Sequence, residues 1–546
     1  MNNQSSKHAL PAFFLIASII GAWLIWDAFT HPLVTYSLWA DYWEHSAALT
    51  EWMRDILNPG NPHLSGEDSS ARYIPNFLVL AALGNLFGWS AIELLSLSSI
   101  INYFLLVAGI YLFSKAYFQD PWAPFITFLV LFFVWGVPWI WSNLYQLRSF
   151  FMVSSYPSTF VFGLSLISFW ISLRFLRLQT RKIKGFLAIS FLSALMFISH
   201  PLTAVFGIAG CCLLALIERD ASPILRLQVI IFLLIGLFLA SYWPYFSVWD
   251  VVLATSDIAD DRTWQSFQGF SAMIERAQSG DWWHVFYDPQ QLVVALGPAL
   301  FGLPICLWLL IKRKESFIIL GAIFMILPYF INIFYQIALA HRFLLYAVFF
   351  LHLSIVWAIL QQKNIWFELR LKRNFLSTDF LGCLVALCFL IVSFSTTVSL
   401  LLYDFKGQHL NQNLVWVDKR QFLPPDATVV DVYTELSTTL SESSIVIGNS
   451  KLTWILPTFK GKVVSLPENH ENSLVPDEKD RIKAEMTFLD PLTNSSDRES
   501  IILQYNVSHA FINKNNSAPE LIEWLKNNAK KVAAIDRYEM YSFAVE

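Results

Sequence analysis

Three ionisable side chains, Asp41, Glu44 and His45, stand close together in a protein in which only 14% of residues are charged. In a helix, their spacing of three and four residues places them on one face. A carboxylate held there could act as a general base toward a hydroxyl or amine acceptor. The same spacing also fits the solvated polar face of an amphipathic helix at a membrane surface. The spacing leaves both interpretations open.

Cationic side chains occur at other segment ends, far from this cluster in the sequence. A phosphate leaving group needs positive donors, and a guanidinium can engage two phosphate oxygens at once. Arg342 is the strongest candidate, because it stands where the chain enters an apolar segment. The complete set of predicted phosphate-binding residues is Arg342, His341, His200 and Arg148.

Two further groups of residues suggest a cation and a sugar. Glu67 and Asp68 are adjacent carboxylates, so they are candidate oxygen ligands for a divalent cation such as Mg²⁺ or Mn²⁺. No other cofactor is predicted. Trp282, Trp283 and Tyr287 could stack on sugar rings, or could lie in the lipid headgroup layer.

The composition places these residues in a membrane protein. The chain has 546 residues, of which 55% are hydrophobic, and its mean hydropathy is +0.50. Nucleic acid is excluded as a partner, because the net charge is −4 and no long basic run occurs. Segments long enough to cross a bilayer are predicted at 10–29, 91–114, 122–142, 157–175, 186–200, 202–217, 227–247, 290–311, 316–334, 343–361 and 378–402.

The distribution of basic residues orients these spans. Basic clusters at 174–184, 312–314 and 363–373 fall on one side, which the positive-inside rule makes cytoplasmic. The number of crossings between the N-terminus and the first basic cluster must then be even, which requires that 73–88 is an interfacial helix on the outer surface. A true span at 73–88 is the alternative. We therefore expect about 11 transmembrane helices, a cytoplasmic N-terminus, and outer loops at 30–90 and 248–289. The candidate residues then gather at the outer membrane boundary.

The last quarter of the chain has a different composition. Residues 404–546 are polar, with predicted strands at 427–433, 444–448, 462–466, 508–512 and 531–535 and helical patterns at 480–489 and 518–529. Such alternation is typical of a small soluble α/β domain with a mostly parallel sheet. We expect a transmembrane catalytic module at 1–403 and an extracytoplasmic domain at 404–546, acting as a lid or as a docking site for the acceptor.

These motifs resemble the GT-C superfamily of polytopic membrane glycosyltransferases, which includes protein O-mannosyltransferases and the lipid A aminoarabinose transferase. The similarity is carried by "DYWEH" after the first span, by "YIPNFLVLAALGNLFG" with the long apolar segment behind it, and by the final α/β domain. The resemblance implies a polyprenyl-phosphate-linked sugar donor, transfer outside the cytoplasm, and Asp41 as catalytic base. The family's usual pair of adjacent acids is interrupted by Tyr42, so either Glu44 or Glu67–Asp68 supplies the second carboxylate.

The predicted function is sugar transfer on the extracytoplasmic face, from a polyprenyl-phosphate-linked donor to a glycan, lipid or protein acceptor. Glu44 and His45 would orient Asp41 or the acceptor. The protein would reside among the lipids of the plasma or inner membrane. A transporter or flippase of lipid-linked saccharide, or a non-catalytic scaffold that binds one, is the alternative. The span interiors argue against transport, because they carry almost no charge; His352 is the main ionisable exception.

Overall fold

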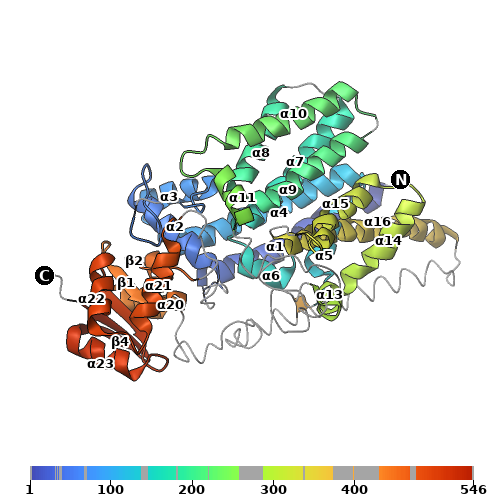
Figure 1. Ribbon diagram of the computed structural model, residues 1–546. Coiled ribbons are helices and arrows are strands. Elements are labelled where there is room, and N and C mark those ends of the chain that lie inside the picture. The colour runs from blue at the N-terminus through green and yellow to red at the C-terminus, as the bar shows by residue number, and fades with distance from the viewer. Residues whose placement is uncertain are drawn as a thin grey trace. The chain divides into compact units, whose positions relative to one another are not determined.

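The structure is a computed structural model that describes residues 3–30, 32, 35, 40–66, 70–136, 145–179, 183–218, 220–257, 287–335, 339–372, 397–398, 429–467 and 475–543. The chain forms two compact units (Figure 1). The first contains residues 1–27, 99–243 and 248–406, and the second contains residues 28–98, 244–247 and 407–546. The loop after the first predicted span therefore belongs to the same unit as the C-terminal domain.

Six helices of the described residues are long and apolar enough to cross a membrane. They are Lys7–Thr30, Ala91–Phe118, Pro157–Leu178, Pro223–Ala240, Pro289–Ile311 and Ala340–Gln361, and they match six of the predicted spans. Four other predicted spans coincide with the shorter apolar helices Ala123–Phe133, Ile183–Ser199, Pro201–Ile217 and Ser316–Ile331. The span predicted at 378–402 lies almost entirely outside the described residues.

The predicted polytopic helical architecture is confirmed. The described helices that lie wholly or largely in the first unit are α1 (Asn3–Thr30), α4 (Ala91–Phe118), α5 (Ala123–Phe133), α6 (Leu147–Val153), α7 (Pro157–Leu178), α8 (Ile183–Ser199), α9 (Pro201–Ile217), α10 (Pro223–Ala240), α11 (Val248–Asp257), α13 (Pro289–Leu296), η5 (Gly297–Phe301), α14 (Gly302–Ile311), α15 (Ser316–Ile331), η6 (Ala340–Arg342) and α16 (Phe343–Lys372). Helices α7 to α10 pack together, and α16 packs against α5, α14 and α15.

Local sequence signals explain several of these boundaries. Pro157, Pro201, Pro223 and Pro289 each stand at the start of a helix, where proline has no backbone N–H to lose. Between α8 and α10, a Cβ added at Gly236 would lie 2.3 Å from the Ser190 carbonyl oxygen. Only a small residue permits this close approach, which is typical of helix packing in membranes.

The second unit joins two helices of the loop after the first predicted span to the C-terminal domain. Its described elements are α2 (Tyr42–Arg54), α3 (Pro75–Phe87), α19 (Val429–Ser437), β1 (Ile445–Gly448), α20 (Ser450–Thr453), η7 (Leu456–Thr458), β2 (Lys462–Val463), α21 (Glu478–Leu489), α22 (Ser495–Gln504), β3 (His509–Asn513), α23 (Pro519–Asn528), β4 (Lys530–Ile535) and β5 (Tyr538–Ser542). The segment at 73–88 contains α3, whose 13 residues are too few for an ordinary span.

The C-terminal sheet has the strand order β2-β1-β3-β5-β4. The predicted α/β domain is confirmed, but the expectation of a mostly parallel sheet is wrong, because β3–β5 and β5–β4 are antiparallel. The strand predicted at 427–433 is also wrong, since α19 occupies that position. Its apolar Val429, Val432, Tyr433 and Leu436 recur with helical spacing and are all buried.

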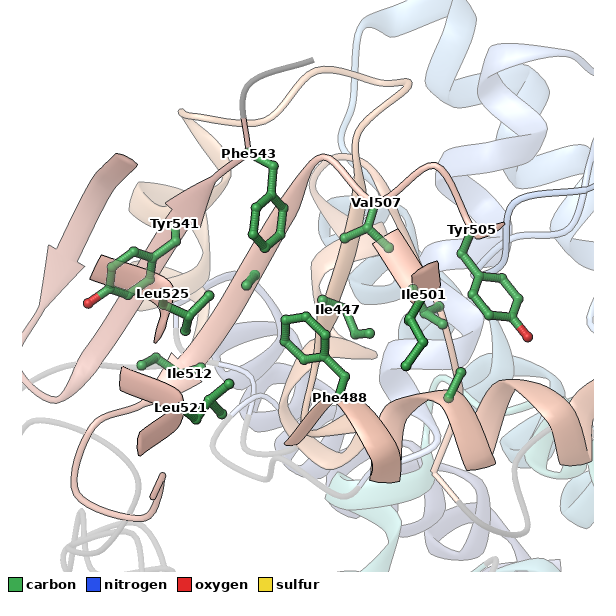
Figure 2. Packing of buried hydrophobic residues seen from close by; sticks show 13 residues of the cluster. Ile447, Phe488, Ile501, Tyr505, Val507, Ile512, Leu521, Leu525, Tyr541 and Phe543 are labelled. Atoms are coloured by element: carbon green, nitrogen blue, oxygen red, sulfur yellow. The ribbon is translucent and has the colours of Figure 1, made fainter. Parts of the chain in front are cut away.

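One face of this sheet carries the core of the domain (Figure 2). Ile447, Ile512 and Tyr541 project from the strands toward Phe488 of α21 and Leu525 of α23. The opposite face is also covered, because Phe511 of β3 contacts the ring of Tyr433 in α19. Helices on both faces of the sheet give the domain a core of its own.

Candidate active site

The first residue of the ionisable cluster stands at the start of a helix. Asp41 immediately precedes α2, and its backbone carbonyl accepts a hydrogen bond from the N–H of His45. Its carboxylate makes no capping hydrogen bond, although aspartate commonly does so at this position. The side chain is half-buried, and the N-terminal end of α2 favours a negative charge there. The Asp41 carboxylate is therefore not used to cap α2.

The other two members of the cluster are buried. Glu44 is 0% exposed, and its carboxylate forms an ion pair with the guanidinium of Arg72. His45 is 2% exposed, and its ring packs edge-on against Phe77 of α3 at 5.3 Å between centroids. The alternative of a solvated polar face is therefore wrong for Glu44 and His45. The buried ion pair fixes this side of α2 against the segment that leads into α3.

The predicted phosphate-binding residues belong to the first unit. His200 caps α9, where its Nδ1 accepts a hydrogen bond from the Thr203 N–H at 3.2 Å. Since a backbone N–H can only donate, Nδ1 is an acceptor and the neutral ring carries its proton on Nε2. Nδ1 also lies 2.8 Å from Thr203 Oγ1, which in turn lies 2.7 Å from the hydroxyl of Tyr346.

This hydrogen-bonded chain ends beside a second predicted residue. Tyr346 stands four residues after Arg342, and the guanidinium of Arg342 interacts electrostatically with its hydroxyl. The structure thus links His200 to Tyr346 through Thr203, and Tyr346 lies one helical turn from Arg342. Both linking residues are buried, Thr203 completely.

The remaining cationic candidates lie in short helices. His341, 6% exposed, lies with Arg342 in η6 directly before α16. Arg148 lies in α6 and is 4% exposed. A buried guanidinium such as that of Arg148 is normally paired with a counter-charge.

The sugar-stacking candidates and the cation ligands are only partly described. The ring of Tyr287 is stacked on Tyr329 at 4.5 Å, and its hydroxyl accepts a hydrogen bond from Asn332. Trp282 and Trp283 lie outside the described residues, as do Glu67 and Asp68. Among the residues that the structure describes, no three His, Cys, Asp or Glu side chains gather as metal ligands would.

Arg72, Thr203 and Tyr346 have no role in the prediction from sequence. Thr203 and Tyr346 carry a detectable signal, because each follows a predicted site residue by three or four positions within a helix. The sequence signal for Arg72 is weaker, because 28 residues separate it from Glu44 and only the fold makes the two residues neighbours.

The sequence matches no protein-family model, and no curated protein sequence matches it either. Solved structures are similar in fold. The apo structure of ArnT from Cupriavidus metallidurans matches with a TM-score of 0.53 and 11% identity, over 98% of both chains. The oligosaccharyltransferase AglB from Archaeoglobus fulgidus, with an inhibitory peptide and a dolichol-phosphate, matches with a TM-score of 0.50 and 13% identity, over 97% of this chain and 74% of its own.

This chain has the fold of ArnT and AglB, which are both GT-C membrane glycosyltransferases. The match to ArnT extends over 98% of both chains, so the shared fold includes the helical module and the C-terminal domain. About a quarter of AglB has no counterpart in this chain. The chain also lacks the "WWDYG" signature of oligosaccharyltransferase catalytic subunits. The GT-C fold predicted from "DYWEH" and the segments around it is thereby confirmed.

Proposed function

We propose that this protein is a membrane glycosyltransferase that moves a sugar from a polyprenyl-phosphate-linked donor to an acceptor on the extracytoplasmic face. The observation that carries the proposal is the GT-C fold, shared with ArnT over 98% of both chains. AglB, which has the same fold, was solved with a dolichol-phosphate, an isoprenoid phosphate of the proposed donor class. The acceptor is a glycan, lipid or protein with a nucleophilic hydroxyl or amine.

The proposed mechanism assigns the proton to Asp41. The carboxylate takes the proton from the acceptor as its oxygen or nitrogen forms a bond to the anomeric carbon of the sugar. The bond between that carbon and the phosphate oxygen breaks, and its electron pair stays on the phosphate. Arg342, His341, His200 and Arg148 stabilise the charge that develops there. Glu44 and His45, held in the buried side of α2, orient the helix end that carries Asp41.

A divalent cation fits the chemistry of Glu67 and Asp68, since adjacent carboxylates offer the oxygen ligands that Mg²⁺ and Mn²⁺ prefer. Such an ion would screen the negative charge of the donor phosphate. The roles proposed for Asp41 and Arg342 depend only on their own side chains.

Transport of the lipid-linked sugar is less well supported. His352, the main ionisable residue of the span interiors, hydrogen-bonds the Val134 carbonyl at 2.8 Å through Nε2. Its ring packs against Trp135 and Tyr145, and the residue is completely buried. His352 is thus a packing residue, as such a histidine usually is in a helix bundle, and it offers no site for a passing substrate.

Arg342 is predicted to bind the donor phosphate. We expect Arg342→Ala to weaken donor binding by at least ~1.5 kcal/mol, the low end for hydrogen bonds to charged groups. Arg342→Lys should retain part of the affinity, because an ammonium supplies charge without the two-pronged geometry. Titration of a fluorescent polyprenyl phosphate into detergent-purified protein measures this. Equal affinity in wild type and Arg342→Ala would remove Arg342 from the site.

The proposed orientation predicts which loops an impermeant thiol reagent reaches. All five native cysteines lie in apolar segments. Cysteines placed at Gln265 and at the exposed Ser443 should therefore react from outside intact cells, whereas cysteines at Thr180 and Gln361 should react only after permeabilisation. Labelling at Thr180 in intact cells would reverse the topology and move the candidate site to the cytoplasmic face.

The donor class can be tested without knowledge of the sugar. Lipids that co-purify with the protein should include a polyprenyl phosphate or its glycosylated form, identified by mass spectrometry. We expect the yield to fall in Arg342→Ala and to persist in Asp41→Asn, because only the first residue is assigned to the phosphate. Co-purification of bulk phospholipid alone, under conditions that retain other polyprenyl-phosphate enzymes' lipids, would contradict the proposed donor.

A further inference from the structure

The helix that carries Asp41 contacts the C-terminal domain along the face opposite to Asp41. Trp43, Ser46 and Thr50 recur on this face at helical spacing, whereas Asp41 and His45 point elsewhere. The Ser46 hydroxyl lies 2.6 Å from the Thr458 hydroxyl, and Thr50 donates a hydrogen bond to the Thr458 carbonyl at 2.9 Å. Ser46 is 0% exposed and Thr458 is 6% exposed. This contact is buried, so separating it would break hydrogen bonds between buried polar groups.

A largely buried ion pair holds the same contact about one turn further along α2. Lys462 of β2 donates to Glu51 of α2 at 2.7 Å and to the carbonyl of Asn61. Both charged side chains are 13% exposed. Burial lowers the pKa of Lys462, and the adjacent Glu51 carboxylate acts in the opposite direction. Arg54, near the end of α2, forms a second ion pair with Glu442.

The backbone makes the contact continuous. The N–H of Val463 donates to the His63 carbonyl at 2.8 Å, and Leu64 pairs in parallel with Val463. The segment after α2 thus adds one backbone bridge beside β2, at an edge of the C-terminal sheet. Arg481 of α21 reaches the same segment through the Ser65 carbonyl. Side-chain and backbone contacts therefore hold α2 and the chain after it on one domain.

We propose that the C-terminal domain is a fixed bracket for α2, in which Thr458 and Lys462 are positioning residues for the catalytic end of that helix. The inference rests on the proposed function, since α2 is important because of Asp41. It excludes a lid that leaves α2 during each reaction cycle. A mobile lid makes few buried contacts, whereas release here would break a largely buried ion pair, a buried hydroxyl pair and a backbone bridge together.

A disulfide tests whether the bracket stays closed during turnover. The hydroxyl oxygens of Ser46 and Thr458 lie 2.6 Å apart, so the two side chains face one another as a disulfide between these positions requires. The double variant Ser46→Cys/Thr458→Cys should cross-link readily on mild oxidation, and its transfer rate should stay within about twofold of the reduced form. The matched control is Ser441→Cys/Ser444→Cys, whose hydroxyl oxygens lie 3.0 Å apart within the domain itself. It shows what oxidation alone does to the rate.

Two results would overturn the bracket. One is loss of transfer on oxidation that returns on reduction in the test pair but is absent in the control pair. The other is failure of the test pair to cross-link while the control pair does so. The yield of cross-link is read by mass spectrometry and needs no activity. It therefore separates failure of the bracket from failure of the proposed function, in which even wild type would transfer no sugar.

Substitution of Lys462 tests its positioning role separately. Lys462→Met should lower kcat by roughly 10–100-fold, the scale of a small misplacement of a catalytic group, and leave the donor KM unchanged. Lys462→Arg should restore most of kcat, because it keeps the charge beside Glu51. The control is Lys460→Met, an exposed neighbour with the same loss of charge. An unchanged kcat in Lys462→Met, or equal loss in both methionine variants, would contradict the role.

Discussion

Asp41→Asn is expected to lower the rate of sugar transfer by roughly 10²–10⁴-fold, the usual contribution of a general base. The amide keeps the shape of the carboxylate and most of its hydrogen bonding, but it takes up no proton at neutral pH. Donor binding and folding should be preserved, because the side chain makes no capping bond in α2. Single-turnover measurement with saturating donor isolates the chemical step.

Two comparison variants sharpen this prediction. Glu44→Gln should reduce transfer less than Asp41→Asn, since Glu44 is already engaged with Arg72 in a buried ion pair. Asp55→Asn, at the other end of the same helix, is the matched control and should transfer at the wild-type rate. If Glu44→Gln is inactive while Asp41→Asn is active, Glu44 is the base. Normal rates in both would place the chemistry elsewhere.

The buried ion pair gives the largest expected effect on stability. Arg72→Met should destabilise the protein by about 3–5 kcal/mol, the usual cost of removing one member of a buried ion pair. Glu44→Gln should cost less, because the side chain of Arg72 is 29% exposed and reaches solvent, whereas that of Glu44 is 0% exposed. The double variant Glu44→Gln/Arg72→Met should therefore recover most of the loss.

The apparent melting temperature in a fixed detergent measures these differences. Arg537→Met is the control, because Arg537 pairs with a largely exposed carboxylate, that of Asp536, and surface pairs contribute about 0–1 kcal/mol. Equal melting temperatures for Arg72→Met and Arg537→Met would show that the Glu44–Arg72 pair contributes no more than a surface pair. A double variant less stable than Arg72→Met would show that the two side chains act separately.

The sequence predicts the elements of this fold better than their contacts. Length and hydropathy are sufficient for the spans at 91–114 and 157–175, because crossing a bilayer demands a long apolar helix whatever its neighbours. The segment at 427–433 misleads, since its β-branched residues suit a strand while its apolar spacing suits a helix. Spacing also places Asp41, Glu44 and His45 on neighbouring positions of a helix without showing what covers them.

What covers α2 comes from distant parts of the chain. Arg72 reaches Glu44 across 28 residues, and Lys462 reaches Glu51 across 411. No local rule predicts such pairs, because they depend on how the loop after the first predicted span folds onto the C-terminal domain. The His200–Thr203–Tyr346 chain is intermediate, since its two helices are far apart in sequence but each contributes a residue at helical spacing from a predicted site residue.

The proposal that this protein transfers sugar is tested most directly by consumption of donor in proteoliposomes that contain the purified protein, a polyprenyl-phosphate-linked sugar and an envelope extract as acceptor. Mass spectrometry should show donor lost and the free polyprenyl phosphate gained in wild type, and neither change in Asp41→Asn that still binds donor. Donor that binds wild type and stays intact would contradict an enzyme and indicate a scaffold. Intact donor that appears in the opposite leaflet would indicate a transporter.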